Sequence, residues 1–328
     1  MHILLSRTDR IGDLILSTAA IATVRKSFPQ ARVTMVCSPY NRVVMERNTD
    51  VDEIVEFVPG TRAGDLGRRF RGLVQTAIAL APRKDDLAIA GGTRAPVRVG
   101  YTYVRRYVAR LTAPLYVNRL MISEADPALS ERRPQLRVRH EVTQLVDLVA
   151  LAGARDRVET LRLDVTEADR SSISYLPAEP IVFHLGMRWF VDGSTLDSTV
   201  ALVQRLHDFG RPVVVTYAPE CEQFVDAFVE SRAADVVLGG LPFHRWAAVF
   251  ERARLVITVD TGATHVASAV RRPTVVAFEH RFFRLNSQEW APYAVPCRLV
   301  RKPGDESPES LARFRNDLFD AVGQLLND

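Results

Sequence analysis

The sequence has few cysteines and no long apolar run. Its three cysteines, Cys37, Cys221 and Cys297, lie far apart without metal-like spacing, so we interpret them as reduced thiols. No apolar run approaches the roughly 18 residues that a membrane-spanning helix needs. The apolar stretch at the N-terminus ends at Ser6, which is too short for the core of a signal peptide. These shortages argue against a secreted or an integral membrane protein and predict a cytoplasmic location.

Several short functional motifs are also absent. No G-x-G-x-x-G follows the first apolar run, and no G-x-x-x-x-G-K-[ST] occurs. The sequence therefore lacks the main motifs of a dinucleotide-dependent oxidoreductase and of a P-loop ATPase. Neither H-E-x-x-H nor a C-x-x-C pair is present, which argues against a zinc enzyme. The acidic "DVD" at residues 50–52 precedes a predicted strand, so we interpret it as a solvated turn rather than a metal–diphosphate site. We expect no metal and no cofactor.

Charge is distributed unevenly along the chain. The formal net charge is +4, yet residues 1–140 carry +10 and residues 141–328 carry −6. Such a basic half indicates an anionic partner: a nucleic acid, an acidic membrane surface or a phosphorylated substrate. Any single arginine could instead be only a solvated side chain, and no recognition helix or aromatic stacking motif supports nucleic acid binding. Four arginines beside the glycine-containing "AGDLG" predict an exposed, mobile segment: Arg62, Arg68, Arg69 and Arg71.

Apolar runs typical of strands alternate with helical patterns through both halves. This alternation predicts an α/β protein with parallel sheets covered by helices on both faces. We expect strands at 2–6, 32–38, 53–59, 73–80, 96–101, 180–186, 212–218, 234–240, 254–260 and 274–278. We expect helices at 14–27, 40–48, 140–154, 197–210, 221–232, 243–253, 263–270 and 307–326.

The predicted domains follow from a polar, proline-containing segment at 155–179, which we interpret as the interdomain link. We expect one domain over 1–160, a second over 161–305, and a C-terminal helical segment over 306–328 that could pack back toward the first domain. Ligands of open parallel sheets bind outside the carboxyl ends of the strands. The turns between strands and helices are therefore the places to look for chemistry.

Two such turns stand out. In "RIGD" the carboxylate of Asp13 lies at the opening of a helix, and in "VDTGATH" a strand leads into residues 260–265. A helix N-terminus offers free N–H groups and partial positive charge, which suit a phosphate, and glycine allows a close approach. The alternative is that Asp13, Asp260 or Thr261 only caps its helix.

Four stretches together resemble glycosyltransferase family 9, the family of the ADP-heptose:lipopolysaccharide heptosyltransferases. They are "RTDRIGDLILSTAAIATVRKSFPQARVTMVC", "HEVTQLVDLVALAG", "IVFHLGMR" and "VITVDTGATHVASAVRRPTVVAF". The resemblance spans nearly the whole chain, in order. It implies a GT-B fold, with two Rossmann-like domains facing across a central cleft, the first binding the acceptor and the second the nucleotide sugar. It also implies inverting transfer without a metal.

The resemblance assigns roles to individual residues. Asp13 matches the proposed general base, which would take the proton of the acceptor hydroxyl. Asp260, Thr261 and Gly262 match the turn that holds the donor diphosphate, with His265 completing that turn and Glu220 lying near the ribose. We expect Asp13 and Gly262 to face each other across the cleft, and the helix dipole to lower the pKa of Asp13.

The sequence departs from the family after the strand at 180–186. Members usually have a proline, then a lysine followed by Arg-Trp-Pro, whereas here Leu185 replaces the proline and Asp192 lies near the lysine position. Arg188 could supply the missing positive charge.

We therefore expect a cytoplasmic glycosyltransferase that moves a sugar, with heptose from ADP-heptose first among candidates, to a lipopolysaccharide-core or other anionic lipid-linked acceptor. Arg62, Arg68, Arg69 and Arg71 would bind this acceptor, and the basic half could contact the inner membrane face. The alternatives are a transferase of the same fold that uses another nucleotide sugar, and a non-catalytic nucleotide-sugar-binding relative.

Overall fold

The chain divides into two α/β units. The computed structural model describes residues 1–58, 60–133 and 135–327. Pro59, the last residue of the strand predicted over 53–59, and Asp328, the last residue of the segment predicted over 306–328, lie outside the described residues. The units are Met1–Leu163 and Asp164–Asp328, and the division falls inside the polar segment 155–179. Each unit is described by itself.

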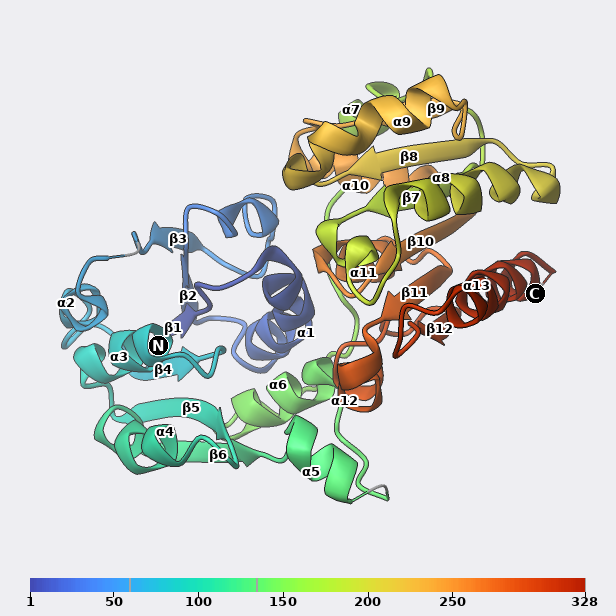
Figure 1. The fold of residues 1–328 in the computed structure, drawn as a ribbon. Helices are drawn as coiled ribbons and strands as arrows, with labels where there is room; N and C mark the ends of the chain where they lie inside the picture. Colours follow the sequence, from blue (N-terminus) through green and yellow to red (C-terminus); the bar gives the residue numbers. More distant parts are fainter. Residues whose placement is uncertain (59, 134, 328) are drawn as a thin grey trace. The chain divides into compact units, whose positions relative to one another are not determined.

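The first unit is built on a six-stranded, all-parallel sheet with the order β3-β2-β1-β4-β5-β6 (Figure 1). The four residues of β1 after His2 are buried, which explains its continuous apolar sequence, because central parallel strands are covered on both faces. The strands are β1 (His2–Ser6), β2 (Arg32–Cys37), β3 (Glu53–Glu56), β4 (Thr76–Ala79), β5 (Val97–Tyr103) and β6 (Arg119–Ser123).

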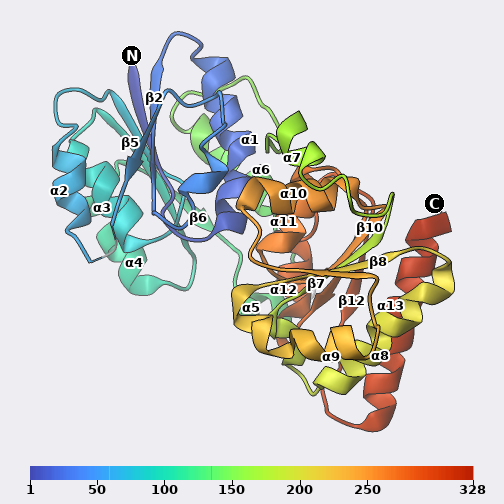
Figure 2. The same ribbon diagram turned by 90° about the horizontal axis from the view of Figure 1, so that it is seen from above.

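Helices cover both faces of this sheet, with α2 and α3 on one side and α1 and α6 on the other (Figure 2). Every residue of α1 from Leu14 to Val24 is buried, because α1 packs against α6 as well as against the sheet. The helices are α1 (Ile11–Ser27), α2 (Ala63–Arg68), α3 (Lys84–Thr93), α4 (Tyr107–Thr112), α5 (Pro127–Arg132) and α6 (Glu141–Ala150), with 3₁₀ turns η1 (Arg42–Val44) and η2 (Ala113–Leu115).

The second unit repeats the strand order of the first. Its parallel sheet runs β9-β8-β7-β10-β11-β12, so in both units the chain starts at the centre, builds one half of the sheet outward and then returns to build the other. This is the doubly wound order of nucleotide-binding folds. The strands are β7 (Ile181–Leu185), β8 (Val213–Tyr217), β9 (Val236–Leu238), β10 (Leu255–Val259), β11 (Thr274–Phe278) and β12 (Cys297–Arg301).

One face of the second sheet carries α8, α9 and α13, and the other carries α10 and α11 (Figure 2). Leu318 and Val322 place α13 in the core of this unit, where it packs on β10, β11 and β12. The helices are α7 (Glu167–Ser171), α8 (Leu196–Arg205), α9 (Val225–Glu230), α10 (Phe243–Arg252), α11 (Gly262–Ala269), α12 (Phe283–Glu289) and α13 (Pro308–Asn327), with 3₁₀ turns η3 (Met187–Phe190), η4 (Leu206–Phe209), η5 (Pro219–Phe224) and η6 (His280–Phe282).

The ten predicted strands are all present, but the sequence analysis misses β6 and β12. Both are edge strands whose residues are mostly half-buried and include arginine, so neither shows a continuous apolar run. It also misses the helices α3, α4, α5, α7 and α12. The interior of α3 contains Gly91 and Gly92. The helix predicted over 40–48 is only the short turn η1.

The expected mobile segment around Arg62–Arg71 is instead a helix packed against its neighbour. A Cβ placed on Gly67 would lie 2.1 Å from the carbonyl oxygen of Ile89, and one on Gly92 would lie 2.4 Å from that of Gly64. The glycines of α2 and α3 therefore serve close helix packing rather than a flexible loop.

This packing predicts that Gly67→Ala destabilises the protein by about 1–3 kcal/mol, because the added methyl group meets backbone that cannot move aside. Gly64→Ala is the matched control in the same helix, since the nearest atom to its Cβ would be 3.9 Å away. The free energy of unfolding from denaturant titration measures both. Equal effects of the two changes would contradict the assigned packing.

Candidate active site

Asp13 lies at the centre of the first sheet, beyond the carboxyl ends of its strands. Strands β1 and β4 are neighbours, yet they lead into helices α1 and α3, which cover opposite faces. Such a switch point is where open parallel sheets bind ligands. Asp13 is the third residue of α1, and Asp86 is the third residue of α3.

Asp13 does not cap its helix. The helix starts at Ile11, three residues before the predicted start, so the cap position belongs to Arg10, whose side chain makes no capping hydrogen bond. The Asp13 side chain instead turns toward Arg7 and remains 16% exposed. The capping alternative therefore has no support from this geometry.

A buried arginine organises the carboxylates around Asp13. Arg7 is 1% exposed, and its guanidinium lies 3.1 Å from Asp9, 3.4 Å from Asp13 and 3.0 Å from Glu141. It also donates to the carbonyl oxygen of Leu80 at 2.6 Å. One cation thus faces three carboxyl groups at the end of β1.

Glu141 anchors this cluster from the start of α6. Its Oε1 accepts hydrogen bonds from Arg7 at 3.0 Å and from the Tyr101 hydroxyl at 2.8 Å, and its Oε2 accepts one from Gln144 at 2.8 Å. The residues of this anchor are almost fully buried. Because each buried polar partner is satisfied, Arg7 has one well-defined position beside Asp13.

Burial raises the pKa of Asp13 to about 7, since desolvation outweighs the attraction of Arg7 and the charges of Asp9 and Glu141 add repulsion. The expectation that the helix dipole lowers this pKa is therefore wrong, because desolvation is the larger effect. Burial also raises the pKa of Asp86 to about 7. Asp13 is thus a partly exposed carboxyl that titrates near neutral pH, as suits a general base.

The four predicted acceptor arginines are all exposed, but they do not gather around Asp13. Arg62 lies at the start of α2, the helix that follows β3. Arg69 and Arg71 flank Phe70, whose ring lies 6.2 Å from the ring of His2, the first residue of β1. Arg68, at the end of α2, Arg69 and Arg71 therefore lie toward the amino edge of the sheet, away from Asp13.

The second unit has an equivalent switch point between β7 and β10. Arg188 follows β7, and its guanidinium donates to the carboxylate of Asp260 at 2.9 Å and to the carbonyl oxygen of the same residue at 2.8 Å. Asn286 donates to this carboxylate at 2.9 Å. Burial nevertheless raises the pKa of Asp260. The structure thus brings together Arg188 and the predicted phosphate turn.

The turn at 260–262 leads directly into α11. Thr261 occupies the cap position without a capping side-chain hydrogen bond, because its hydroxyl bonds back to the carbonyl oxygen of Val259 at 3.3 Å. The helix therefore starts at Gly262 with N–H groups that no Thr261 side chain covers. Of the other predicted donor residues, His265 is buried, with its ring 6.3 Å from that of Trp290, and Glu220 is exposed after β8.

Lys302, which the sequence analysis overlooks, supports the loop that departs from the family pattern. Its buried ammonium donates to the backbone carbonyls of Arg188, Trp189 at 2.9 Å and Val191 at 2.6 Å. Burial lowers the pKa of Lys302 to about 8. A lysine from the end of β12 thus fixes the segment that carries Arg188. The only feature of the sequence that could have indicated Lys302 is its position directly after β12, a strand that was not predicted.

Across residues 1–58, 60–133 and 135–327, no group of three or more His, Cys, Asp or Glu could hold a metal ion. In the same part of the chain, no helix is both long and apolar enough to cross a membrane.

Solved structures with the same fold cover the whole chain. A glycosyltransferase family 9 protein from Veillonella parvula matches with a TM-score of 0.78 at 19% identity, over 99% of this chain and 97% of its own. The E. coli ADP-heptose LPS heptosyltransferase II matches with 0.76 at 18%, over 99% and 98%. E. coli heptosyltransferase WaaC with ADP-2-deoxy-2-fluoro heptose matches with 0.69 at 16%, over 99% of each. These likenesses and the two sheets define a two-domain α/β protein of the GT-B fold.

A family model matches part of the second unit. Residues 200–310 match the model of glycosyltransferase family 9 (heptosyltransferase). No curated protein matches the chain. Residues 200–310, which lie in the second unit, thus match glycosyltransferase family 9, in agreement with the resemblance seen in the sequence, and this match supports a heptosyltransferase-like glycosyltransferase.

The raised pKa of Asp13 makes a prediction about stability. Between the unfolded value of 3.8 and about 7, the folded state holds a proton that the unfolded state has lost. This contribution to stability therefore decreases as pH rises through that window. Asp13→Asn cannot ionise, so its stability relative to the wild type should increase by ~1–3 kcal/mol between pH 5 and pH 8.

Unfolding by denaturant at the two pH values measures this difference. The matched control is Asp65→Asn, since Asp65 is likewise the third residue of a helix but is exposed. If the free energies of unfolding of the wild type and of Asp13→Asn change in parallel between the two pH values, the raised pKa of Asp13 is contradicted.

Proposed function

We propose that the chain is an inverting, metal-independent glycosyltransferase that transfers heptose from ADP-heptose to a lipopolysaccharide-core or other anionic lipid-linked acceptor. The observation that carries this proposal is Asp13: a partly exposed carboxyl whose pKa is raised to about 7, held beside a buried arginine at a sheet switch point. Single displacement at an anomeric carbon needs one carboxylate to take the proton of the acceptor hydroxyl. Asp13 is the candidate for that role.

The donor half of the proposal rests on the second unit. As the sugar is transferred, the bond from its anomeric carbon to the diphosphate breaks and the diphosphate gains negative charge. Thr261 and Gly262 present a helix N-terminus, and Arg188 lies beside them, so both could stabilise that charge. ADP-heptose is the first candidate because one solved relative is named for it and another holds a fluoro analogue of it.

The proposal keeps Arg62 as an acceptor residue, because it is exposed at the start of the helix that follows β3. Arg68, Arg69 and Arg71 were predicted for the same role, but their place near the amino edge gives them no geometric support. Glu220 and His265 remain predicted donor residues, near the ribose and in the diphosphate turn. The alternative is a donor other than ADP-heptose. It is favoured by residues 185–192, where the sequence departs from the usual pattern of the family.

A donor screen combined with Asp13→Asn tests the proposal. Thermal shift across nucleotide sugars identifies the donor, and release of nucleoside diphosphate with a lipopolysaccharide-core acceptor measures turnover. Asp13→Asn should lose ~10²–10⁴-fold in kcat, as expected for a lost general base, while the donor still binds.

Asp65→Asn, the exposed equivalent in α2, should keep wild-type turnover. Near-wild-type turnover of Asp13→Asn would remove Asp13 from the mechanism. A second outcome would point to a non-catalytic relative: nucleotide sugars that bind without any transfer or release by the wild type.

A further inference from the structure

Helix α4 in the first unit exposes an unusual amount of apolar surface. None of its residues is buried. Tyr107 is 64% exposed, Val108 76%, Leu111 81% and Leu115, in the adjoining turn η2, 79%. These four side chains, here called the α4 face, lie within nine residues, whereas the other exposed large apolar side chains of the described residues are spread from Met1 to Val229. A concentrated apolar patch of this kind marks an interaction surface.

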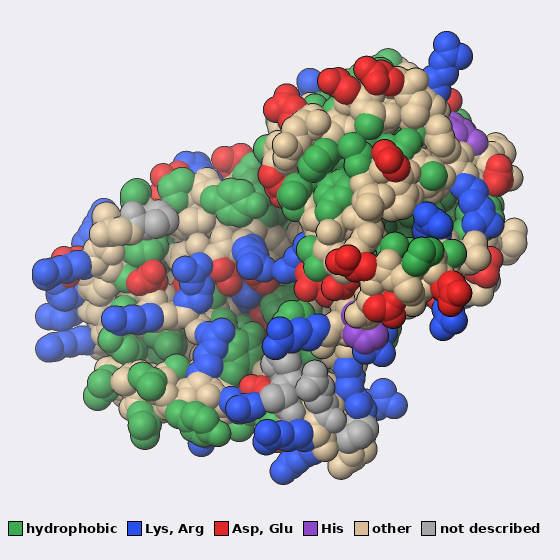
Figure 3. Space-filling view, in the orientation of Figure 1, with side chains coloured by type: hydrophobic (Ala, Val, Ile, Leu, Met, Phe, Trp, Pro, Cys, Tyr) green, Lys and Arg blue, Asp and Glu red, His purple; other side chains and the backbone are tan. Residues whose placement is uncertain are grey.

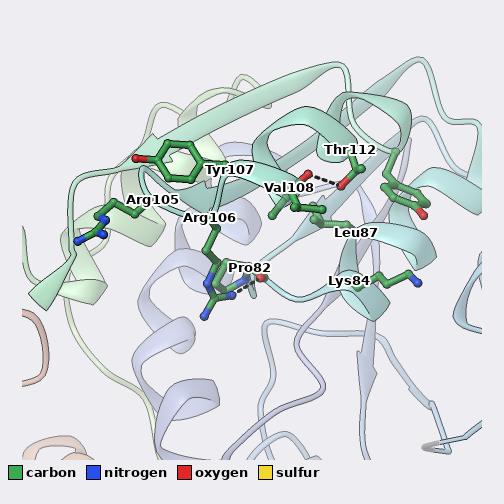
Figure 4. A pocket seen from close by; sticks show the side chains of 10 residues that line it. Pro82, Lys84, Leu87, Arg105, Arg106, Tyr107, Val108 and Thr112 are labelled. Carbon is green, nitrogen blue, oxygen red and sulfur yellow. Dashed lines mark hydrogen bonds between the residues drawn. The ribbon is translucent and has the colours of Figure 1, made fainter. Parts of the chain in front are cut away.

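Helix α4 stands off its own domain. A hollow of about 550 Å³ separates it from the start of α3, with Pro82 and Leu87 on one side and Tyr107 and Val108 on the other (Figure 4). Packing of α4 onto α3 would have filled this space and buried the apolar side chains. Two hydrogen bonds instead hold its N-terminal side: Arg106 donates to the carbonyl oxygen of Pro82 at 3.1 Å, and Arg110 donates to that of Val104 at 2.9 Å.

The surroundings of the α4 face are strongly cationic. The 37 residues from 87 to 123 contain six arginines and no aspartate or glutamate. Arg105, Arg106 and Arg110 are exposed next to the apolar side chains, and Lys84 lies across the hollow. In Figure 3, hydrophobic atoms gather over the α4 region with lysine and arginine side chains around them. The surface therefore combines protruding apolar side chains with positive charge.

We propose that the α4 face and its arginines form a docking surface for an anionic phospholipid membrane. Apolar side chains that project from a short helix can enter the boundary between headgroups and acyl chains, and the arginines can bind the lipid phosphates. Charge complementarity favours a lipid surface over a second copy of the chain, because two such faces would bring the same arginines together.

The position of α4 also fits the proposed reaction. It follows β5 and so begins at the carboxyl edge of the sheet, the edge that carries Asp13. Docking through α4 would bring that edge toward a lipid-linked acceptor. This link rests on the proposed function, whereas membrane binding itself does not require it.

Flotation of the whole protein with vesicles tests the proposal without donor or acceptor. The wild type should bind vesicles of phosphatidylcholine with phosphatidylglycerol and should bind pure phosphatidylcholine vesicles much less. High salt should weaken binding, because exposed charges are screened. Leu111→Ser with Leu115→Ser should weaken binding at least about tenfold, since each exposed leucine loses apolar transfer energy.

The matched control carries Tyr175→Ser and Val229→Ser, two exposed apolar positions of the second unit, and should bind like the wild type. Melting temperature confirms that both double variants fold. Three outcomes would overturn the proposal: a wild type that binds no vesicles, equal binding by the α4 double variant, or a dimer in solution that the α4 double variant abolishes. Loss of turnover with unchanged vesicle binding would concern the proposed function alone.

Discussion

The guanidinium of Arg7 is the group around which the candidate active site is built. It is buried at the end of the central strand β1 and lies within 3.4 Å of three carboxyl groups. A buried cation without these partners would be very costly, and breaking such a pair typically costs about 3–5 kcal/mol. Glu141 holds the arginine through a hydrogen bond, and Tyr101 donates a hydrogen bond to the same carboxylate oxygen of Glu141. The charges of Asp9 and Glu141 oppose the effect of Arg7 on Asp13. Desolvation therefore outweighs the attraction of Arg7 and raises the pKa of Asp13.

The repeated strand order explains why each unit has its own polar cluster at a corresponding place. In the first unit, helices leave β1 and β4 for opposite faces, and in the second the chain does the same after β7 and β10. Arg7 and Asp13 mark the first switch point, and Arg188 and Asp260 mark the second. The two clusters differ in charge balance. In the first, a buried arginine faces three carboxyl groups, which suits proton transfer. In the second, a more exposed arginine pairs with Asp260 beside a helix N-terminus, which suits a phosphate.

The sequence alone predicted the central strands and both candidate site turns, because buried parallel strands are continuous apolar runs and glycine or acidic residues follow them directly. It missed β6 and β12, since edge strands are half-exposed and carry arginines. It also missed Arg7, Glu141 and Lys302. These residues meet their partners across up to 134 positions of the chain, so no local pattern reveals them. The pKa of Asp13 was predicted in the wrong direction because burial by distant residues outweighs the local helix dipole.

The central claim is that Asp13 titrates near neutral pH in the folded protein. The most direct measurement is NMR of the carboxyl carbon in protein labelled with ¹³C at aspartate, with the Asp13 signal assigned by its absence in Asp13→Asn. The account predicts a titration midpoint at about 7, well above the value of an exposed aspartate. A midpoint near 3.8, the ordinary value, would contradict it and leave the cluster around Arg7 a structural feature only.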